Sequence, residues 1–405
     1  MTSSTNGFSR SGLQRLHRAM AGHVDAGRVP GLVTLVDRHG ETHLDAIGTT
    51  ELGGTVPVRA DTIFRISSMT KPITAVAVMI LVEECRLRLD APVEEWLPEL
   101  ADRRVLRSPD APLDDTVPAE RPITVRDALD FRLGLGMILT AEAFGSPFFA
   151  AAQELGVSGF GPPRPDLPHT PDEWLARVAT LPLLDQPGRR WSYNIGSYVQ
   201  SVLVERATGA SFPEFLRERI FEPLGMRDTG FAVPAADLDR FTAAYGVGAD
   251  GALELYDPRE GSAWSREPAF PDGAGALVST AHDYLAFARM LRDGGTCGGE
   301  RILSRRAVAL MTSNRLTAQQ CQESFGGVDG WGFGVGVGLR GDDLWRTPGR
   351  YGWDGGMGTS WYTDPAEGLV GVLLTQRLEY PSANPVWLDF WTSVYAALEG
   401  ATVEG

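Results

Sequence analysis

The longest apolar run of the chain is Ile73–Val82, interrupted only by Thr74, and it directly follows Lys71 and Pro72. A membrane-spanning helix needs about 20 apolar residues, so this shorter run predicts a helix buried in a globular core. Proline is tolerated only in the first turn of a helix. Pro72 therefore places the helix start close to Ser68, and the rest of the fold has to cover the helix.

The overall composition is that of a compact globular protein. The chain has 405 residues, of which 43% are hydrophobic and 22% are charged, so it can bury a sizeable core. At about 150 residues for each domain, two or three structural units are expected. The 37 basic and 52 acidic residues give a formal net charge of -15. Nucleic-acid backbones and anionic membranes need a basic face, so we expect neither as a partner.

The cysteines and histidines predict neither disulfides nor a metal site. Cys85, Cys297 and Cys321 lie far apart, and no CxxC pair is present. The opening MTSSTNGFSRSGLQ lacks a basic segment followed by an apolar one, so no secretory signal is visible. We therefore expect reduced thiols and a cytoplasmic protein. The six histidines have no metal-ligand spacing such as HExxH, so no metal and no cofactor are expected.

Strand patterns occur near both ends of the chain. Four segments form two predicted hairpins: Gly31–Asp37 with Thr42–Ile47, and Ser360–Thr363 with Leu369–Gln376. Amphipathic helices are predicted over residues 11–27 and 386–398, and the second has an apolar stripe wide enough to cover a sheet face. The segment 331–339 alternates glycine with larger apolar residues and predicts a closely packed strand, although it also matches GxGxxG at 336–341.

The middle of the chain predicts helices rather than strands. Three capping-box patterns precede amphipathic segments: Thr124-x-x-Asp127, Thr170-Pro171-Asp172-Glu173 and Ser211-x-x-Glu214. The proline-rich stretch 145–168 predicts a long loop. The predicted fold class is therefore α/β plus all-α, with an antiparallel sheet flanked by helices. Residues 1–85 and 229–405 form a discontinuous α/β domain, and residues 86–228 form an inserted helical subdomain.

Lys71 is the only lysine in the chain, and all other basic residues are arginine. A guanidinium keeps its proton at neutral pH, whereas a lysine can act as a base. Ser68 lies three positions earlier, so on a helix the two side chains share a face about 5–6 Å apart. Backbone N–H groups at a helix start also suit an oxyanion. For Lys71 to activate Ser68, its pKa must fall by roughly 3 units, which burial can cause.

These motifs resemble those of the serine β-lactamase and penicillin-recognising superfamily, most closely its class C-like family VIII carboxylesterases. The similarity extends from VPGLV (29–33) to the last helix. Its most specific segments are SSMTKPIT (67–74), LRLDAPVEEWLPEL (87–100), PITVRD (122–127), PGRRWSY (187–193), IFEPLGMRDTGF (220–231) and GWDGGMGTSW (352–361). The resemblance implies the β-lactamase/transpeptidase-like fold, with an active site between the sheet domain and the helical subdomain.

The resemblance also implies roles for individual residues. Ser68 would be the acylated nucleophile, Lys71 its partner, and Tyr193 the group that moves the proton to the leaving group. The backbone N–H groups of Ser68 and Gly356 would form the oxyanion hole. The residues expected to contact substrate are Trp353, Asp354 and Gly355, which look like the family's KTG counterpart, and Asn194 and Ile195, which follow Tyr193.

The sequence departs from the β-lactamase pattern at three places. Trp353 stands where a lysine helps to hold the β-lactam carboxylate. Tyr193-Asn194-Ile195 replaces Tyr-x-Asn, and ALDFRLGLG (128–136) carries no histidine where the family often has one. The first two changes favour a neutral acyl group, although Arg346 and Arg350 remain candidate cations. The third change affects a wall of the pocket.

We therefore predict a carboxylic ester hydrolase that cleaves small neutral acyl esters through a Ser68 acyl-enzyme. A β-lactamase, a D-amino-acid peptidase and an acyltransferase are alternatives on the same scaffold, and a non-catalytic binding protein is a further one. The expected partner is a small-molecule ester or amide, while the oligomeric state stays open. The side chains of Phe144, Phe148, Phe149 and Trp174 fit either an acyl pocket or core packing.

Overall fold

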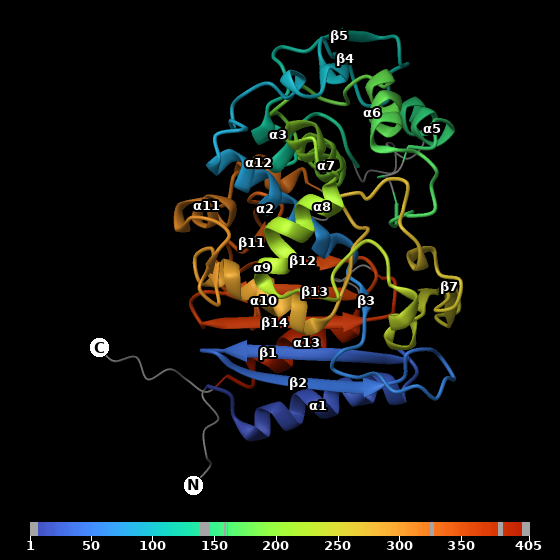
Figure 1. Cartoon of the computed structure of the whole chain (residues 1–405), viewed down its shortest axis with the longest axis vertical. Coiled ribbons are helices and arrows are strands. Elements are labelled where there is room, and N and C mark those ends of the chain that lie inside the picture. Colours follow the sequence, from blue (N-terminus) through green and yellow to red (C-terminus); the bar gives the residue numbers. More distant parts are fainter. Residues whose placement is uncertain are drawn as a thin grey trace.

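The computed structural model describes residues 7–137, 146–157, 159, 161–324, 328–379 and 384–398. Within these residues, six strands form a central antiparallel sheet in the spatial order β11-β12-β13-β14-β1-β2 (Figure 1). The strands are β1 Gly31–Arg38, β2 Glu41–Gly48, β11 Gly336–Val337, β12 Tyr351–Gly355, β13 Thr359–Asp364 and β14 Leu369–Thr375.

Both predicted hairpins are confirmed as β1–β2 and β13–β14. Strands β1 and β14 then pair with each other, with Leu35 opposite Val372, so the two ends of the chain share one sheet. In contrast, only Gly336–Val337 of the glycine-rich segment 331–339 is a strand, so the predicted length was wrong.

Alternating side chains of β1 and β14 point to two separate apolar layers. Leu32 and Val36 join Leu373 in a cluster with α1 (Arg10–Asp25) and α13 (Pro385–Tyr395). The neighbouring positions, such as Leu35 and Leu374, face a larger cluster on the other side. There the sheet contacts α10 (Ala281–Arg292), which Thr280 caps. This antiparallel sheet with helices on both faces confirms the predicted fold class.

The predicted central helix is α2, Thr70–Glu83, preceded by a 3₁₀ turn at Ser67–Met69. Every residue from Thr70 to Leu81 is buried, as expected for a helix without a polar face. Pro72 lies in the first turn of α2, where its missing N–H costs no hydrogen bond. Helix α2 packs against α7 (Ile195–Thr208) of the helical region.

Helices are the main regular elements of residues 86–228. Much of this range lies at the end of the molecule opposite α1, whereas its last helices, over residues 212–224, lie nearer the sheet (Figure 1). Thr124–Asp127 and Thr170–Glu173 form reciprocal capping boxes, whereas Ser211 only accepts from the Glu214 N–H. The elements are β4 Arg104–Leu106, β5 Thr116–Pro118, α3 Val125–Leu129, α5 Pro147–Glu154, α6 Pro171–Thr180, α7, α8 Phe212–Leu216, a π turn Arg217–Phe221 and α9 Glu222–Leu224. The boundaries of a separate subdomain stay a prediction.

The prediction of one long loop over residues 145–168 was wrong, because α5 lies within it. Ser146 accepts a hydrogen bond from the Phe149 N–H, and Pro147 occupies the first helical position. Phe148 and Ala152 then face the core. The proline that suggested a loop is a helix-start residue here.

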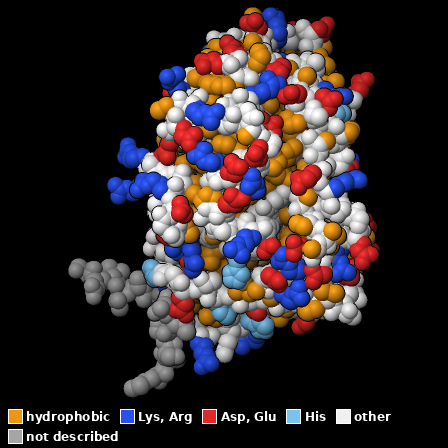
Figure 2. Space-filling view, in the orientation of Figure 1, with side chains coloured by type: hydrophobic (Ala, Val, Ile, Leu, Met, Phe, Trp, Pro, Cys, Tyr) orange, Lys and Arg blue, Asp and Glu red, His pale blue; other side chains and the backbone are white. Residues whose placement is uncertain are grey.

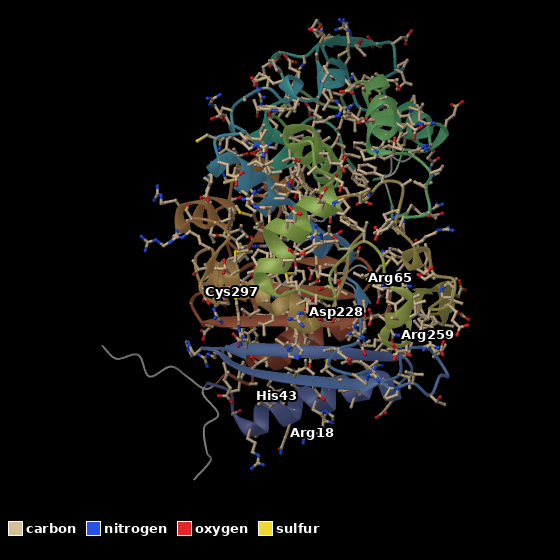
Figure 3. All side chains as sticks on the ribbon, viewed as in Figure 1. Arg18, His43, Arg65, Asp228, Arg259 and Cys297 are labelled. Atoms are coloured by element: carbon tan, nitrogen blue, oxygen red, sulfur yellow. The ribbon has the colours of Figure 1, made fainter. Side chains whose placement is uncertain are left out.

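Shorter elements surround the sheet. They are β3 Phe64–Arg65, β6 Ala244–Val247, β7 Leu253–Asp257, β8 Val278–Ser279, β9 Thr296–Cys297, β10 Glu300–Arg301, α11 Arg305–Met311 and α12 Ala318–Gln322. Arg65 of β3 forms an ion pair with Asp257 at the end of β7 and donates to the Thr242 carbonyl, on the side of the molecule where β7 lies (Figure 3). The Arg65 side chain thus attaches the β6–β7 hairpin to the strand that leads to Ser68.

The surface agrees with the acidic composition. Acidic and basic side chains are interspersed on the face in Figure 2, and no large basic area is visible on it. In the part of the chain that the structure describes, every helix is too short or too polar to cross a membrane.

Candidate active site

The turn before α2 holds Ser68 in a partly exposed position between buried neighbours. Ser67 has φ 48°, a conformation that non-glycine residues rarely adopt. The Thr70 hydroxyl donates to the Ser67 carbonyl at 2.7 Å, and the Tyr284 hydroxyl donates to the Met69 carbonyl at 2.8 Å. Ser67 and Met69 are buried, whereas Ser68 reaches solvent. The turn therefore presents one hydroxyl to a substrate and fixes the backbone on either side.

Lys71 lies one helical turn after Ser68 and is fully buried. Its Nζ donates to the Ser68 Oγ at 2.9 Å and to the Ala274 carbonyl at 2.6 Å. Burial lowers the pKa of Lys71 to about 7, against an opposing effect of the Asp272 carboxylate. A large fraction of the Lys71 side chains is therefore neutral at physiological pH and able to accept a proton from Ser68.

The Tyr193 ring lies next to the Lys71 amine. The Lys71 Nζ is 4.6 Å from the centre of the Tyr193 ring, and the Trp353 Nε1–H donates to the Tyr193 hydroxyl oxygen at 2.8 Å. An indole N–H can only donate, so the phenol oxygen is the acceptor in this bond. The phenol proton is thus directed away from Trp353. Tyr193 comes from the helical region and Trp353 from the sheet, so the two regions meet at this pair.

Aromatic rings support Tyr193 and Trp353 from behind. Phe131 and Trp191 lie 6.0 and 5.7 Å from the Tyr193 ring, and Trp331 lies 4.7 Å from Trp353 in an edge-to-face contact. Phe131, Trp191 and Trp331 are buried. Such contacts restrict both rings, because side-chain rotation would disturb several neighbours.

The end of β12 lies against the turn that carries Ser68. A Cβ on Gly355 would be 2.4 Å from the Ile66 carbonyl oxygen and 2.1 Å from the Thr359 Oγ1, so only glycine fits. The Thr359 hydroxyl also donates to the Ile66 carbonyl at 3.0 Å. Gly356 follows as an exposed residue beside Ser67, with 4.0 Å between its Cβ position and the Ser67 Oγ. The predicted oxyanion residues, Ser68 and Gly356, are thus neighbours in space.

The structure directs Asp354 away from Ser68, contrary to the prediction of a substrate contact. Successive side chains of a strand point to opposite faces, and Trp353 takes the face toward Tyr193. Asp354 accepts from the Tyr362 hydroxyl at 2.8 Å and from the Trp387 Nε1–H at 2.7 Å, on the side of α13. Burial raises the pKa of this carboxyl group. The Asp354 side chain therefore supports the sheet and α13 and does not face Ser68.

Asn194 and Ile195 are also structural neighbours of the site rather than surfaces open to substrate. Asn194 has φ 89° and is 6% exposed, and its amide donates to the Gly159 carbonyl at 2.9 Å. Ile195 is 1% exposed in the main core cluster. With its positive φ, Asn194 is the N-cap of α7, directly after Tyr193. Contrary to the prediction, neither side chain is open to a substrate.

The candidate cations and the candidate acyl-pocket residues lie elsewhere or in the core. Arg350 is buried over the rings of Tyr362 and Trp391, at 3.8 and 4.2 Å, on the side of α13, so it is no cation for a substrate carboxylate at Ser68. Arg346 pairs with Asp342. The side chains proposed for an acyl pocket, Phe148, Phe149 and Trp174, belong to the core, and Phe144 lies outside the described residues.

The turn that contains Asp272 and Ala274 was not predicted from the sequence. The Ala274 carbonyl accepts the shorter of the two Lys71 hydrogen bonds, and Asp272 is the charged group that acts on the Lys71 pKa. Burial raises the pKa of Asp272 itself to about 6, an effect that hydrogen bonds from the Ala274 and Gly275 N–H groups oppose. A single acid followed by Gly-Ala-Gly inside an apolar stretch was the available signal.

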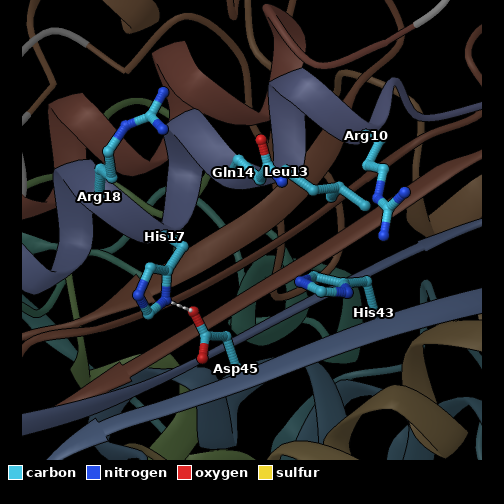
Figure 4. Close-up of a pocket in the computed structure, with 7 residues that line it drawn as sticks. All are labelled: Arg10, Leu13, Gln14, His17, Arg18, His43 and Asp45. Atoms are coloured by element: carbon cyan, nitrogen blue, oxygen red, sulfur yellow. Dashed lines mark hydrogen bonds and ion pairs between the residues drawn. The ribbon is translucent and has the colours of Figure 1, made fainter. Parts of the chain in front are cut away.

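A separate cavity of about 450 Å³ lies between α1 and β2, away from these residues. The His17 ring there bonds to the Asp45 carboxylate at 2.6 Å, and Arg10 and His43 project into the same space (Figure 4). Among the residues that the structure describes, no group of three or more His, Cys, Asp or Glu side chains is arranged to hold a metal ion.

Comparison with known proteins agrees with this arrangement. Residues 16–394 match the family described as Beta-lactamase. Protein Rv1367c of Mycobacterium tuberculosis is 38% identical over 364 residues, 87% of each chain, and Esterase EstB of Burkholderia gladioli is 34% identical over 387 residues, 91% of each chain. The structure of EstCE1, "a hydrolase with promiscuous acyltransferase activity", superimposes with a TM-score of 0.78 at 27% identity and covers 95% of this chain and 99% of that chain. The chain therefore belongs to the beta-lactamase family.

Proposed function

We propose that this protein is a serine carboxylesterase that forms an acyl-enzyme at Ser68. The observation that carries the proposal is the 2.9 Å hydrogen bond between the Ser68 Oγ and a fully buried Lys71 amine. Because the pKa of Lys71 is lowered to about 7, the amine can act as a base near neutral pH. The esterase names among its relatives support the same activity.

In the proposed reaction, the Ser68 Oγ attacks the ester carbonyl carbon while its proton passes to Lys71. The oxyanion of the tetrahedral intermediate binds the N–H groups of Ser68 and Gly356. The carbon–oxygen bond to the alcohol then breaks, and the alkoxide leaves with a proton supplied through Tyr193. Water attacks the acyl-enzyme by the same route in reverse, which releases the acid and returns the proton to Ser68.

Two features favour a neutral acyl group. Trp353 is uncharged, and its N–H is already bonded to Tyr193. Arg350, the candidate cation for a carboxylate, packs against aromatic rings on the side of α13. A β-lactam carboxylate would thus find neither a lysine at position 353 nor the Arg350 guanidinium, whereas a simple ester needs no such cation. We propose a small-molecule ester as substrate, and a cytoplasmic location because Cys85, Cys297 and Cys321 are free thiols.

Acyl transfer is the second candidate function. It shares the Ser68 acyl-enzyme and differs only in the acceptor, an alcohol or amine in place of water. EstCE1, which combines hydrolase and acyltransferase activities in its description, is the observation that favours it. An added alcohol that diverts the acyl group from the free acid to a new ester would identify this activity.

The proposed function is tested by hydrolysis of p-nitrophenyl acetate, butyrate and octanoate, with nitrocefin measured in parallel. We expect ester turnover that favours the shorter chains, little nitrocefin cleavage, and at least a thousandfold loss of kcat in Ser68→Ala. The exposed Ser313 supplies a control, since Ser313→Ala should keep wild-type rates. Faster turnover of nitrocefin than of any ester would replace the esterase with a β-lactamase.

A further inference from the structure

The turn Asp272–Gly275 is a buried element that packs between α2 and α7. The Thr74 hydroxyl of α2 donates to the Gly273 carbonyl at 2.7 Å, and the Gly273 N–H donates to the Ser201 Oγ of α7 at 3.3 Å. A Cβ on Gly273 would be 2.6 Å from the Thr74 methyl group and 2.8 Å from the Ser197 carbonyl. The turn is therefore closely packed against both helices, and its internal geometry influences where its carbonyl groups point.

Asp272 determines that internal geometry. Its Oδ1 accepts hydrogen bonds from both the Ala274 and the Gly275 N–H groups, each at 2.9 Å, and the residue is 3% exposed. An aspartate that binds the N–H groups two and three positions ahead folds the backbone around its carboxylate. Without the Asp272 carboxylate, these two buried N–H groups would lose their hydrogen-bond partner, at a considerable cost in folding free energy.

The folded turn directs the Ala274 carbonyl at the Lys71 Nζ, 2.6 Å away. A carbonyl can only accept, so one N–H of Lys71 points at Ala274 whether the amine is charged or neutral. The remaining positions of the amine are then turned toward Ser68, at 2.9 Å, and toward the Tyr193 ring. For a neutral amine, this orientation places the lone pair where the Ser68 proton can reach it.

We propose that Asp272 is a positioning residue of the active site, which folds the 272–275 turn so that the Ala274 carbonyl orients the Lys71 amine toward Ser68. This inference rests on the proposed roles of Ser68 and Lys71. It assigns to Asp272 an effect on the acylation step, through a backbone carbonyl and not through contact with substrate.

The charge of Asp272 has a second, smaller consequence. Among the described residues, the Lys71 amine faces the Ser68 hydroxyl, the Ala274 carbonyl, the Tyr193 ring and the Asp272 carboxylate. Of these four groups, only the Asp272 carboxylate carries a charge that acts on the Lys71 pKa. The carboxylate raises this pKa, against the larger effect of burial. Its removal therefore moves the protonation of Lys71 to lower pH.

Two substitutions separate the turn geometry from the charge. Asp272→Asn keeps an oxygen for the two N–H groups and removes the charge, whereas Asp272→Ala removes both. Asp283 provides a matched control, because it is a buried carboxylate that also accepts a backbone N–H, from Asp228, but lies at the start of α10. Asp283→Ala thus reports the cost of losing a buried acid elsewhere.

The measurements are the labelling rate of Ser68 by a fluorophosphonate, kcat and KM for p-nitrophenyl acetate, and the thermal midpoint of each variant. For Asp272→Ala we expect kcat and the labelling rate to fall tenfold or more at nearly unchanged KM, as for a displaced catalytic group. Asp272→Asn should keep kcat within about threefold of wild type at pH 8 and move the acidic limb of its pH profile to lower pH. Asp283→Ala should lower the thermal midpoint and leave the labelling rate, kcat and KM unchanged.

Equal labelling rates for wild type and Asp272→Ala would overturn this inference and leave the proposed function intact. A loss in Asp272→Asn as large as that in Asp272→Ala, with an unmoved pH profile, would also overturn it, because the acceptor oxygen would then have no effect. Absence of wild-type labelling would instead overturn the proposed function, and the positioning role with it.

Discussion

The chemistry proposed for this protein depends on a lysine in a chain that otherwise uses arginine. Lys71 is buried on a helix that is apolar on all sides, and its amine bonds to one hydroxyl and one carbonyl. Arginine would remain charged in this position, and its planar guanidinium would replace the compact amine between Ser68 and Ala274. Desolvation lowers the pKa of the amine, so the same burial that protects the helix also makes Lys71 a base.

The pH dependence of kcat/KM should therefore show an acidic limb with a midpoint near 7. Above the pKa of about 7, Lys71 is neutral and accepts the Ser68 proton; below it, the ammonium ion cannot. We expect activity to fall about tenfold for each pH unit on the acidic side. Lys71→Arg should lose at least a hundredfold in kcat at every pH. Full activity at pH 5, or an active Lys71→Arg variant, would show that Lys71 is not the base.

The hydrogen bond from Trp353 to Tyr193 supports a second prediction. Trp353→Phe keeps a ring between Tyr193 and Trp331 but removes the N–H donor to the phenol oxygen. A bond of this kind is worth about 1 kcal/mol or somewhat more, so kcat for p-nitrophenyl acetate should fall about tenfold. The matched control is Trp387→Phe, which removes an indole donor to Asp354 on the other face of the sheet.

Trp387→Phe should lower the thermal midpoint and leave kcat within about twofold of wild type. An equal loss of kcat in both variants would mean that Tyr193 does not depend on the Trp353 donor.

At the scale of elements, the site depends on how closely the end of β12 approaches the turn before α2. That approach is possible because position 355 has no side chain and because the Thr359 hydroxyl of β13 bonds to the Ile66 carbonyl. The strand alternation then sends Trp353 toward Tyr193 and Asp354 toward α13. One strand thereby supports the site on one face and attaches a helix on the other.

Gly355→Ala should cause a large loss of activity and only a moderate loss of folding stability. The new methyl group would meet the backbone at Ile66 and push Gly356 away from Ser68, so we expect a loss of kcat of a hundredfold or more. Gly371→Ala is the matched control: its methyl group would be 2.7 Å from the Trp391 ring, on the α13 face of the same sheet.

Both variants should lose stability in urea, by roughly 1–3 kcal/mol, as expected for overpacking. Only Gly355→Ala should lose activity in the folded state. A fully active Gly355→Ala variant would contradict the proposed position of the oxyanion hole.

At the scale of the whole molecule, one apolar core connects the sheet and the helical region. It includes Leu35 of β1, Val76 of α2, Ile123, Leu203 of α7 and Leu374 of β14. Helix α2 lies between the two regions, and the site takes Lys71 from this helix, Tyr193 from one side and Ala274 from the other. The active-site geometry therefore exists only when both regions are folded.

We expect the full chain to unfold in urea in one cooperative transition. Seven of the ten tryptophans lie outside residues 86–228, so their fluorescence reports mainly on the sheet region, whereas circular dichroism at 222 nm also follows the helical region. With a shared core, the two signals should have the same midpoint. Separate midpoints would indicate that the region 86–228 is an independent domain.

Local sequence patterns were sufficient for many elements. The Thr124 and Thr170 capping boxes, the two hairpins and the start of α2 near Pro72 each depend on residues within a few positions of one another. The spacing of Ser68 and Lys71 is also local, because a helical turn brings the two side chains together whatever the rest of the chain does. The proline-rich α5 was missed because a proline signals a helix start as well as a loop.

The amino-acid sequence by itself thus determined many of the elements, the family motifs and the Ser68–Lys71 pair, since all of these depend on neighbours along the chain. Only the tertiary structure decided which face of β12 holds Asp354, where the Trp353 N–H points, and that the Ala274 carbonyl, 203 positions from Lys71, accepts a hydrogen bond from the Lys71 amine. These contacts join segments that are distant in sequence, and their geometry comes from packing around α2, which no local pattern specifies. The lowered pKa of Lys71 has the same origin, because desolvation is a property of the assembled core.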